Sequence, residues 1–288
     1  PCGTLFPYTT LFRSPPALPI PITLERFVVH NGTVVYHDRQ GGTKVSLGDI
    51  DQQVRFDIDK ALRDITTKGS LAISDISLLS KDVANPLTGL TVTLSHDLGL
   101  NLMEGVLQIK DLRASLQEIF VSATGVVENL NEDPALDIAV ATDTIALGDI
   151  LAEISVEMVP AVAKTKAKGT FVLDAEVKGA MSEADFPRVD GTVRIDNGTI
   201  HYTDLPKAIN DLNADIGFTT NSLDIATLEL KLGENPIGLK GTVEDFAEPL
   251  VDLALMAKVD LGDVKDIVPL PEGNSLEGRT RARRKAKG

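Results

Sequence analysis

Four histidines, His30, His37, His96 and His201, are the side chains best suited to bind a metal ion or transfer a proton near neutral pH. A metal site needs three or four converging ligands, and the chain has no HExxH or CxxC spacing that would bring such ligands together. His37 precedes Asp38 and resembles half of a general-base pair, but no serine or cysteine with a nucleophile motif accompanies it. We therefore interpret the histidines as solvated residues of hairpins and strands, and we expect neither a metal site nor a cofactor.

The 42 acidic residues could in principle supply an acid/base pair. They fall instead on the polar positions of alternating segments, as Asp137, Asp174 and Asp252 do. There is no GxxxxGK or GxGxxG loop for a phosphate and no EF-hand pattern for calcium. The formal net charge is −14, and the tail 279–288 contains basic residues but no acidic ones. The rest of the chain is therefore more acidic than the whole and should repel nucleic acid. These features predict a protein that is not an enzyme and does not bind nucleic acid.

Hydrophobic and polar residues alternate in most segments, which is typical of β-strands. In residues 170–178, for example, Phe171 and Leu173 fall on one side and charged residues fall on the other. The runs 212–218 and 251–259 follow the same pattern. Successive side chains of a strand point to opposite faces, so each segment has one apolar and one more polar face. The pattern predicts a mainly β fold: an elongated, curved antiparallel sheet with few short helices.

Two Asn-Gly pairs, Asn31-Gly32 and Asn197-Gly198, lie between residues that favour strands. Asn-Gly in this setting predicts a two-residue β-hairpin turn, because both residues tolerate positive φ. Each pair also begins a glycosylation sequon, but the turn already explains the sequence and is the preferred interpretation. A β-branched residue resists positive φ, so replacing Gly198 with Val should destabilise the fold by about 1–3 kcal/mol.

Helical patterns are few. Residues 145–158 could form a helix that ends before Pro160, and residues 263–268 could form one helical turn. The polar stretch 164–169 is the best candidate for a boundary between two halves. We divide the chain into four parts: residues 1–14, a first β-repeat region at 15–163, a second β-repeat unit at 164–278, and a basic tail at 279–288. Residues 1–14 resemble a translated sequencing adapter. Both this segment and the basic tail are expected to be disordered.

Two sequence patterns occur twice, in the same order. Residues 30–38 (HNGTVVYHD) return as 196–204 (DNGTIHYTD), and residues 125–128 (GVVE) return as 241–244 (GTVE). The first copy contains extra strands, roughly at 65–107. Each half is therefore interpreted as one copy of a β-unit, and such units stack because none can bury a sheet face alone.

The second half resembles the C-terminal region of AsmA family proteins. The resemblance is carried by GTFVLD at 169–174, FPRVDGTV at 186–193, DNGTIHY at 196–202 and LKGTV at 239–243. It covers residues 169–276 well and residues 18–160 more weakly. It implies a periplasmic protein of the diderm bacterial envelope, similar to bridge-like lipid-transfer proteins, with a curved β-groove and no catalytic residues. It also implies an N-terminal anchor in the inner membrane, which this sequence lacks and which we expect in the full-length protein.

Two functions remain open at this point. One is the carriage or guidance of phospholipid along an apolar β-groove between the inner and outer membranes, in support of outer-membrane homeostasis. The other is a structural or assembly role in the envelope, in which the same apolar residues form a closed core and hold no lipid. The residues expected to contact acyl chains alternate in phase with their strands: Phe171, Leu173, Val177, Ile216, Phe218, Leu223, Ile225, Leu228, Leu230, Ile237, Leu239, Val251, Leu253 and Leu255.

Overall fold

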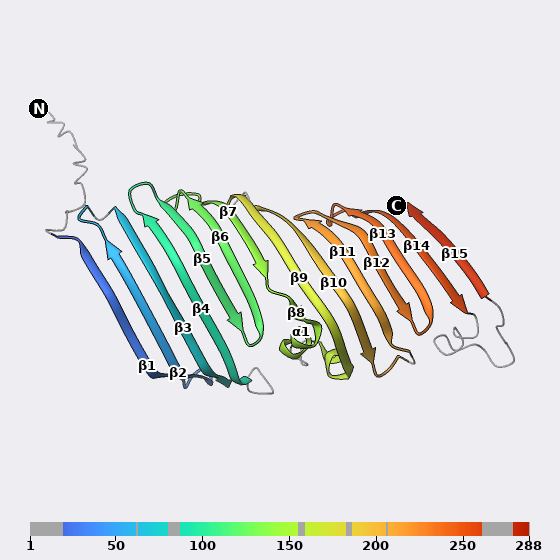
Figure 1. Ribbon diagram of the computed structural model, residues 1–288, viewed down its shortest axis with the longest axis horizontal. Helices are drawn as coiled ribbons and strands as arrows, with labels where there is room; N and C mark the ends of the chain where they lie inside the picture. The colour runs from blue at the N-terminus through green and yellow to red at the C-terminus, as the bar shows by residue number, and fades with distance from the viewer. Residues whose placement is uncertain are drawn as a thin grey trace, which may run out of the picture.

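The computed structural model describes residues 20–61, 63–79, 87–154, 159–182, 186–205, 207–260 and 279–287. These residues form one open antiparallel β-sheet, which Figure 1 shows as a single layer with β1 and β15 at its two ends. One short α-helix and one 3-10 helix accompany the sheet. The mainly β fold with few helices, predicted from the alternation of residues, is thus confirmed.

The strands are long, and most of them span 10 to 17 residues. They are β1 (Ile22–Asp38), β2 (Thr43–Ile58), β3 (Asp64–Leu79), β4 (Leu87–Asn101), β5 (Val106–Leu116), β6 (Ile119–Glu128), β7 (Ala135–Thr142), β8 (Ile145–Ala146), β9 (Thr165–Ala180), β10 (Arg188–Tyr202), β11 (Ile209–Thr219), β12 (Ser222–Leu232), β13 (Asn235–Glu244), β14 (Leu250–Asp260) and β15 (Arg279–Lys287). The helices are α1 (Leu147–Glu153) and η1 (Pro160–Lys164).

The strands are ordered in the sheet as they are in the sequence. Each strand pairs with the next one along the chain, except that β7 pairs with β9 and the two-residue β8 also pairs with β9. β8 and α1 therefore continue the chain beside the part of β9 that β7 leaves unpaired, and α1 packs against β8 and β9. Such an arrangement requires only short connections, so the local alternation of residues is enough to build it.

The region between the two halves differs from the expectation. The helix predicted at 145–158 is limited to α1, and residues 155–158 lie outside the described part of the chain, as do residues 1–14 and the helical turn expected at 263–268. The polar stretch 164–169 was expected to be a connector, but from Thr165 onward it is the first part of β9. Its alternating lysines occupy one face of that strand, which explains why a strand resembles a polar linker here. The sheet continues across this point without a break.

The two Asn-Gly pairs are not hairpin turns, so that prediction was wrong. They lie inside β1 and β10, at places where the pairing register shifts. Asn31 has φ of 50° and Asn197 has φ of 53°, whereas the glycine that follows each is outside the left-handed region. The backbone N–H of Asn197 donates to the side-chain Oδ1 of Asn213, 2.9 Å away on β11. The dipeptide Asn-Gly is thus found at a β-bulge as well as in hairpin turns, and here the adjacent strand supplies a side-chain acceptor for the asparagine N–H.

The Gly198→Val prediction stands, but the reason for it changes. A Cβ at Gly198 would lie 2.8 Å from the Cβ of Leu212 and 3.1 Å from its carbonyl oxygen. We expect this overpacking to lower the free energy of unfolding by about 1–3 kcal/mol in a urea titration. Gly217→Val is the matched control, since the nearest atoms to its Cβ position are 3.9 Å away. Equal unfolding midpoints for the two variants would contradict the close approach at Gly198.

The bulges at the two Asn-Gly pairs share their geometry, which supports the repeat inferred from the sequence. In both copies a second bulge lies on the adjacent strand, where Asp49 has φ of 47° and Asp211 has φ of 52°. In both, the residue after that aspartate is the cross-strand partner of the bulge glycine. The two partner pairs are Gly32 with Ile50 and Gly198 with Leu212.

The second repeated pattern also corresponds in detail. Gly125 on β6 has φ of 150° and Gly241 on β13 has φ of 134°. At the same point the preceding strand contains a bulge, between Ile109 and Leu112 in one copy and between Ile225 and Leu228 in the other. Because four strands thus match in register, the first copy is a longer version of the second, with an additional pair of strands.

The basic tail was expected to be disordered, but residues 279–287 form β15 and pair antiparallel with β14. The register places Arg279 opposite Asp260 and Lys287 opposite Asp252. Without β15, β14 would leave its outer N–H and C=O groups unpaired, and basic residues are common in strands that occupy such an edge.

Candidate functional site

The residues expected to contact acyl chains all fall on one face of the sheet. Residues directly opposite each other in neighbouring strands share a face, and the register links Leu173 through Val193 to Ile216 and then to Ile225. It continues from Ile225 and its neighbours through β13 to β14. The full set on this face is Phe171, Leu173, Val177, Ile216, Phe218, Leu223, Ile225, Leu228, Leu230, Ile237, Leu239, Val251, Leu253 and Leu255.

The same face extends across the first half of the sheet, where no site residues were predicted. Val177 pairs with Ile138, and from there the register leads strand by strand to Phe27 on β1. We call this whole surface, from β1 to β14, the apolar face. Its members in the first half include Phe27, Val29, Phe56, Leu71, Leu94, Ile109, Val127 and Ile138. Their alternation in the sequence was the signal that could have found them.

No second layer covers the apolar face among the residues that the structure describes. Strands contact their neighbours in the sheet. The helix α1 packs mainly against β8 and β9, and η1 lies beside β9, where its Lys164 also reaches Thr203 and Asp204. Within the described residues no large side chain is fully buried. Phe27 is 48% exposed, Val34 is 53% exposed and Leu255 is 41% exposed. A contiguous apolar surface of this kind is unusual in a soluble monomer and points to a binding partner or ligand.

Two polar side chains on the apolar face satisfy each other. Thr67 on β3 and His96 on β4 are diagonal neighbours, because His96 pairs with Gly69 and Thr67 pairs with Leu98, and Thr67 Oγ1 is 3.0 Å from His96 Nε2. Because these two groups can hydrogen-bond to each other, they depend less on water when an apolar ligand covers them. The other histidines are not gathered with this pair: His30 Nδ1 lies 3.1 Å from Asp51 Oδ1 on an exposed surface, and His37 and His201 lie in other strands. No group of three potential metal ligands occurs in the described parts of the chain.

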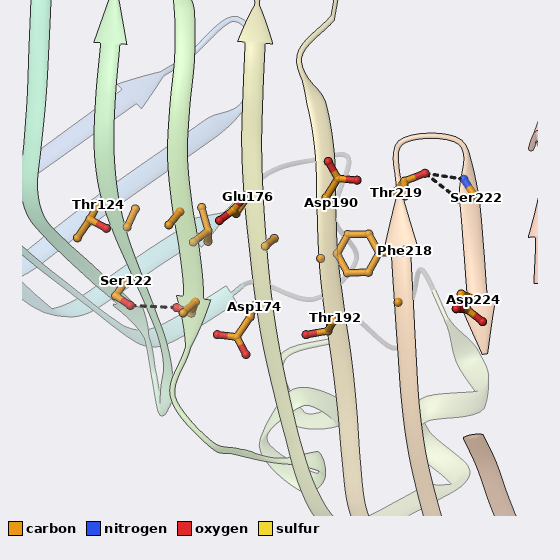
Figure 2. Close-up of a pocket in the computed structure, with 17 residues that line it drawn as sticks. Ser122, Thr124, Asp174, Glu176, Asp190, Thr192, Phe218, Thr219, Ser222 and Asp224 are labelled. Carbon is orange, nitrogen blue, oxygen red and sulfur yellow. Dashed lines mark hydrogen bonds between the residues drawn. The ribbon is translucent and has the colours of Figure 1, made fainter. Parts of the chain in front are cut away.

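The opposite face is polar. A shallow depression of about 680 Å³ lies across β6, β7 and β9 to β12, lined mainly by residues of this polar face, and Figure 2 shows Asp174, Glu176, Asp190 and Asp224 there. A second depression of about 410 Å³ lies on the same face over β1 to β6. These two hollows thus lie mainly over the polar face, although apolar atoms contribute to their lining, and the apolar face is an open surface rather than an enclosed pocket.

Several carboxylates of the polar face, including Glu176 and Asp190, have basic neighbours. Lys178 Nζ is 2.8 Å from Glu176, and this hydrogen bond, with the charges of Glu176 and Asp137, raises the pKa of Lys178. Arg188 Nε is 2.6 Å from Asp190, whose hydrogen bond and charge raise the pKa of Arg188. These are solvated ion pairs between alternate residues of a strand, and the arrangement does not resemble an acid/base or nucleophile constellation.

Comparisons with known proteins do not identify the chain: no family model, no curated protein and no solved structure matches it. Among the described helices, none is long and apolar enough to cross a bilayer. Function is therefore inferred from the two faces of the sheet.

Proposed function

We propose that this chain binds phospholipid acyl chains on its apolar face and guides them along the sheet, without catalysis and without a cofactor. The observation that supports the proposal best is the apolar face, which continues across the strands from β1 to β14 apart from polar positions such as Gln52, Thr67 and His96, and which no described element covers. The polar face gives the sheet its solubility, since charged residues such as Asp174, Glu176 and Lys178 alternate there.

The dimensions of the sheet suit acyl chains. Neighbouring strands lie about 4.8 Å apart, so the distance across the sheet from β1 to β14, perpendicular to the strands, is about 60 Å. An acyl chain that spans half of a bilayer core is about 15 Å long and would cover about three strands. Each methylene group removed from water contributes about 0.8 kcal/mol, so even partial contact offsets part of the cost of leaving the bilayer.

The resemblance to AsmA family proteins supplies the cellular setting of the proposal. In that setting the chain lies in the periplasm as part of a longer protein anchored in the inner membrane, and it carries phospholipid between the inner and outer membranes. Its acidic composition is compatible with movement past anionic lipid headgroups without adhesion, because like charges repel.

The alternative is an envelope scaffold whose apolar face is a closed core without lipid. A closed core needs a second layer over the sheet, and none of the described elements provides one. An open apolar face exposed to water would be costly, so it requires either lipid or a protein surface.

Lipid loading distinguishes the two functions. The purified chain is mixed with vesicles of phosphatidylethanolamine and phosphatidylglycerol, isolated by gel filtration, extracted and measured by mass spectrometry. We expect phospholipid in a roughly stoichiometric amount, displaced by detergent. Phospholipid no greater than that carried by a soluble control protein of similar size would reject lipid binding and favour the scaffold.

A further inference from the structure

The outer edge of β1 lacks a partner among the residues that the structure describes. β1 pairs with β2 along one side only. Its side chains are correspondingly open, with Val35 57% exposed and Tyr36 60% exposed. In the second copy of the repeat, the equivalent strand β10 lies between β9 and β11, and Tyr202, the counterpart of Tyr36, is half-buried. The two copies thus differ in that the described residues include no strand on the outer edge of β1.

β9 shows what a strand at that edge must be like. It pairs with β10 on both sides of the bulge, with Ala167 opposite Ile200 and Thr170 opposite Asp196. Between these pairs, Gly169 adopts φ of 107° beside the bulge. A Cβ at Gly169 would lie 2.7 Å from the Cα of Gly198, so a side chain cannot be accommodated there. A strand that crosses this bulge needs a glycine at the crossing point.

We propose that the open edge of β1 binds an antiparallel strand of a partner polypeptide that carries a glycine opposite the Asn31-Gly32 bulge and alternating apolar residues that extend the apolar face. The bulge of β1 has the same backbone features as that of β10, so it imposes the same requirement. A second copy of the chain does not meet the requirement through its other edge, because residues 279–287 of β15 contain no glycine. Main-chain hydrogen bonds along an open edge provide the affinity, and the glycine and the alternating side chains set the register.

Disulfide trapping tests the pairing and its register. The probe is a synthetic peptide with the sequence of β9, TKAKGTFVLDAEVKGA, in which the residue at the position of Ala167 is cysteine. The full chain contains a single cysteine, so Cys2→Ser with Val34→Cys gives one thiol at the counterpart of Ile200. One control peptide moves the cysteine to the position of Thr170, and another replaces the glycine at position 169 with valine. Circular dichroism checks that the variant is folded. A second reporter pair combines Tyr36→Cys in the chain with a peptide whose cysteine stands at the position of Thr165, the partner of Tyr202.

We expect a disulfide with the in-register peptide and about tenfold less with the shifted one, because Cα atoms more than about 7 Å apart cannot be bridged. The valine peptide should also react about tenfold less than the glycine peptide, since it cannot cross the bulge. Equal yields with all three peptides, or no disulfide with either reporter, would overturn the proposal. A protein dimer linked through the thiol introduced by Val34→Cys, in place of the peptide adduct, would show that a second copy occupies the edge and would also overturn it.

Discussion

The variant Leu253→Asp is expected to lose most of the phospholipid that the wild-type chain acquires from vesicles, by about tenfold, while it remains folded. Leu253 lies on the apolar face opposite Gly241, and it is half-buried within an open layer. In the lipid-free chain the new carboxylate stays hydrated, so the expected loss of stability is no more than about 1 kcal/mol, the value of a cross-strand contact. When acyl chains lie over it, the carboxylate loses its water without gaining a partner. Mass spectrometry of extracted lipid measures the loss.

Ala254→Asp is the matched control, because Ala254 is the next residue on β14 and belongs to the polar face, opposite Lys240. It should load lipid as the wild type does. Leu228→Asp repeats the test on an interior strand. Unfolding of Leu253→Asp and Leu228→Asp in the absence of lipid would indicate a closed core, since an unpaired charge would then be buried. Equal loading of Leu253→Asp and Ala254→Asp would show that lipid does not lie on the apolar face.

The largest loss of stability is expected for valine at Gly125 or Gly241. A Cβ at Gly125 would lie 2.1 Å from the carbonyl oxygen of Asp137, and a Cβ at Gly241 would lie 2.0 Å from that of Asp252. Both glycines also have positive φ, which a β-branched residue resists. The clash involves the backbone of the neighbouring strand, which cannot move without breaking the ladder. We expect the free energy of unfolding to fall by about 3–5 kcal/mol in each case, from backbone strain and overpacking together.

Gly99→Val serves as the control for this pair, because the nearest atoms to its Cβ position are 3.8 Å away. Urea titrations of the three variants measure the difference. Similar effects at Gly125 and Gly241 would follow from their equivalent places in the repeat. Midpoints close to that of the wild type at both positions would contradict the close strand approach there.

The alternation of residues was enough to predict the fold, but local sequence did not distinguish a turn from a bulge. Asn197-Gly198 has the composition of a hairpin turn, and Asn197 does adopt positive φ. In the extended strand, the backbone N–H of Asn197 donates to the side chain of Asn213 on β11, and β10 is paired on both sides. That acceptor is distant in sequence, and it becomes relevant only after the strands have paired. The same reasoning applies to the basic tail, whose pairing depends on the free edge of β14.

The apolar residues of the second half were predictable from their alternation, and one detail shows the limit of that reasoning. Ile225 and Leu228 are three residues apart, so strict alternation would place them on opposite faces. The bulge between them restores a common face, with Leu228 opposite Leu239 and Ile225 opposite Gly241. The extent of the face across the first half was not predicted, because it depends on the pairing of β7 with β9, which joins the two halves.

Photo-crosslinking from the two sides of one strand tests the central claim most directly. A photoreactive amino acid is placed at Leu228, on the apolar face, or at Thr227, which pairs with Asp215 on the polar face. Each full-length variant is incubated with the same phospholipid vesicles, irradiated and analysed by mass spectrometry of the intact protein. We predict a phospholipid adduct from position 228 and little or none from position 227. No adduct from position 228, or equal adducts from both positions, would contradict lipid binding by the apolar face.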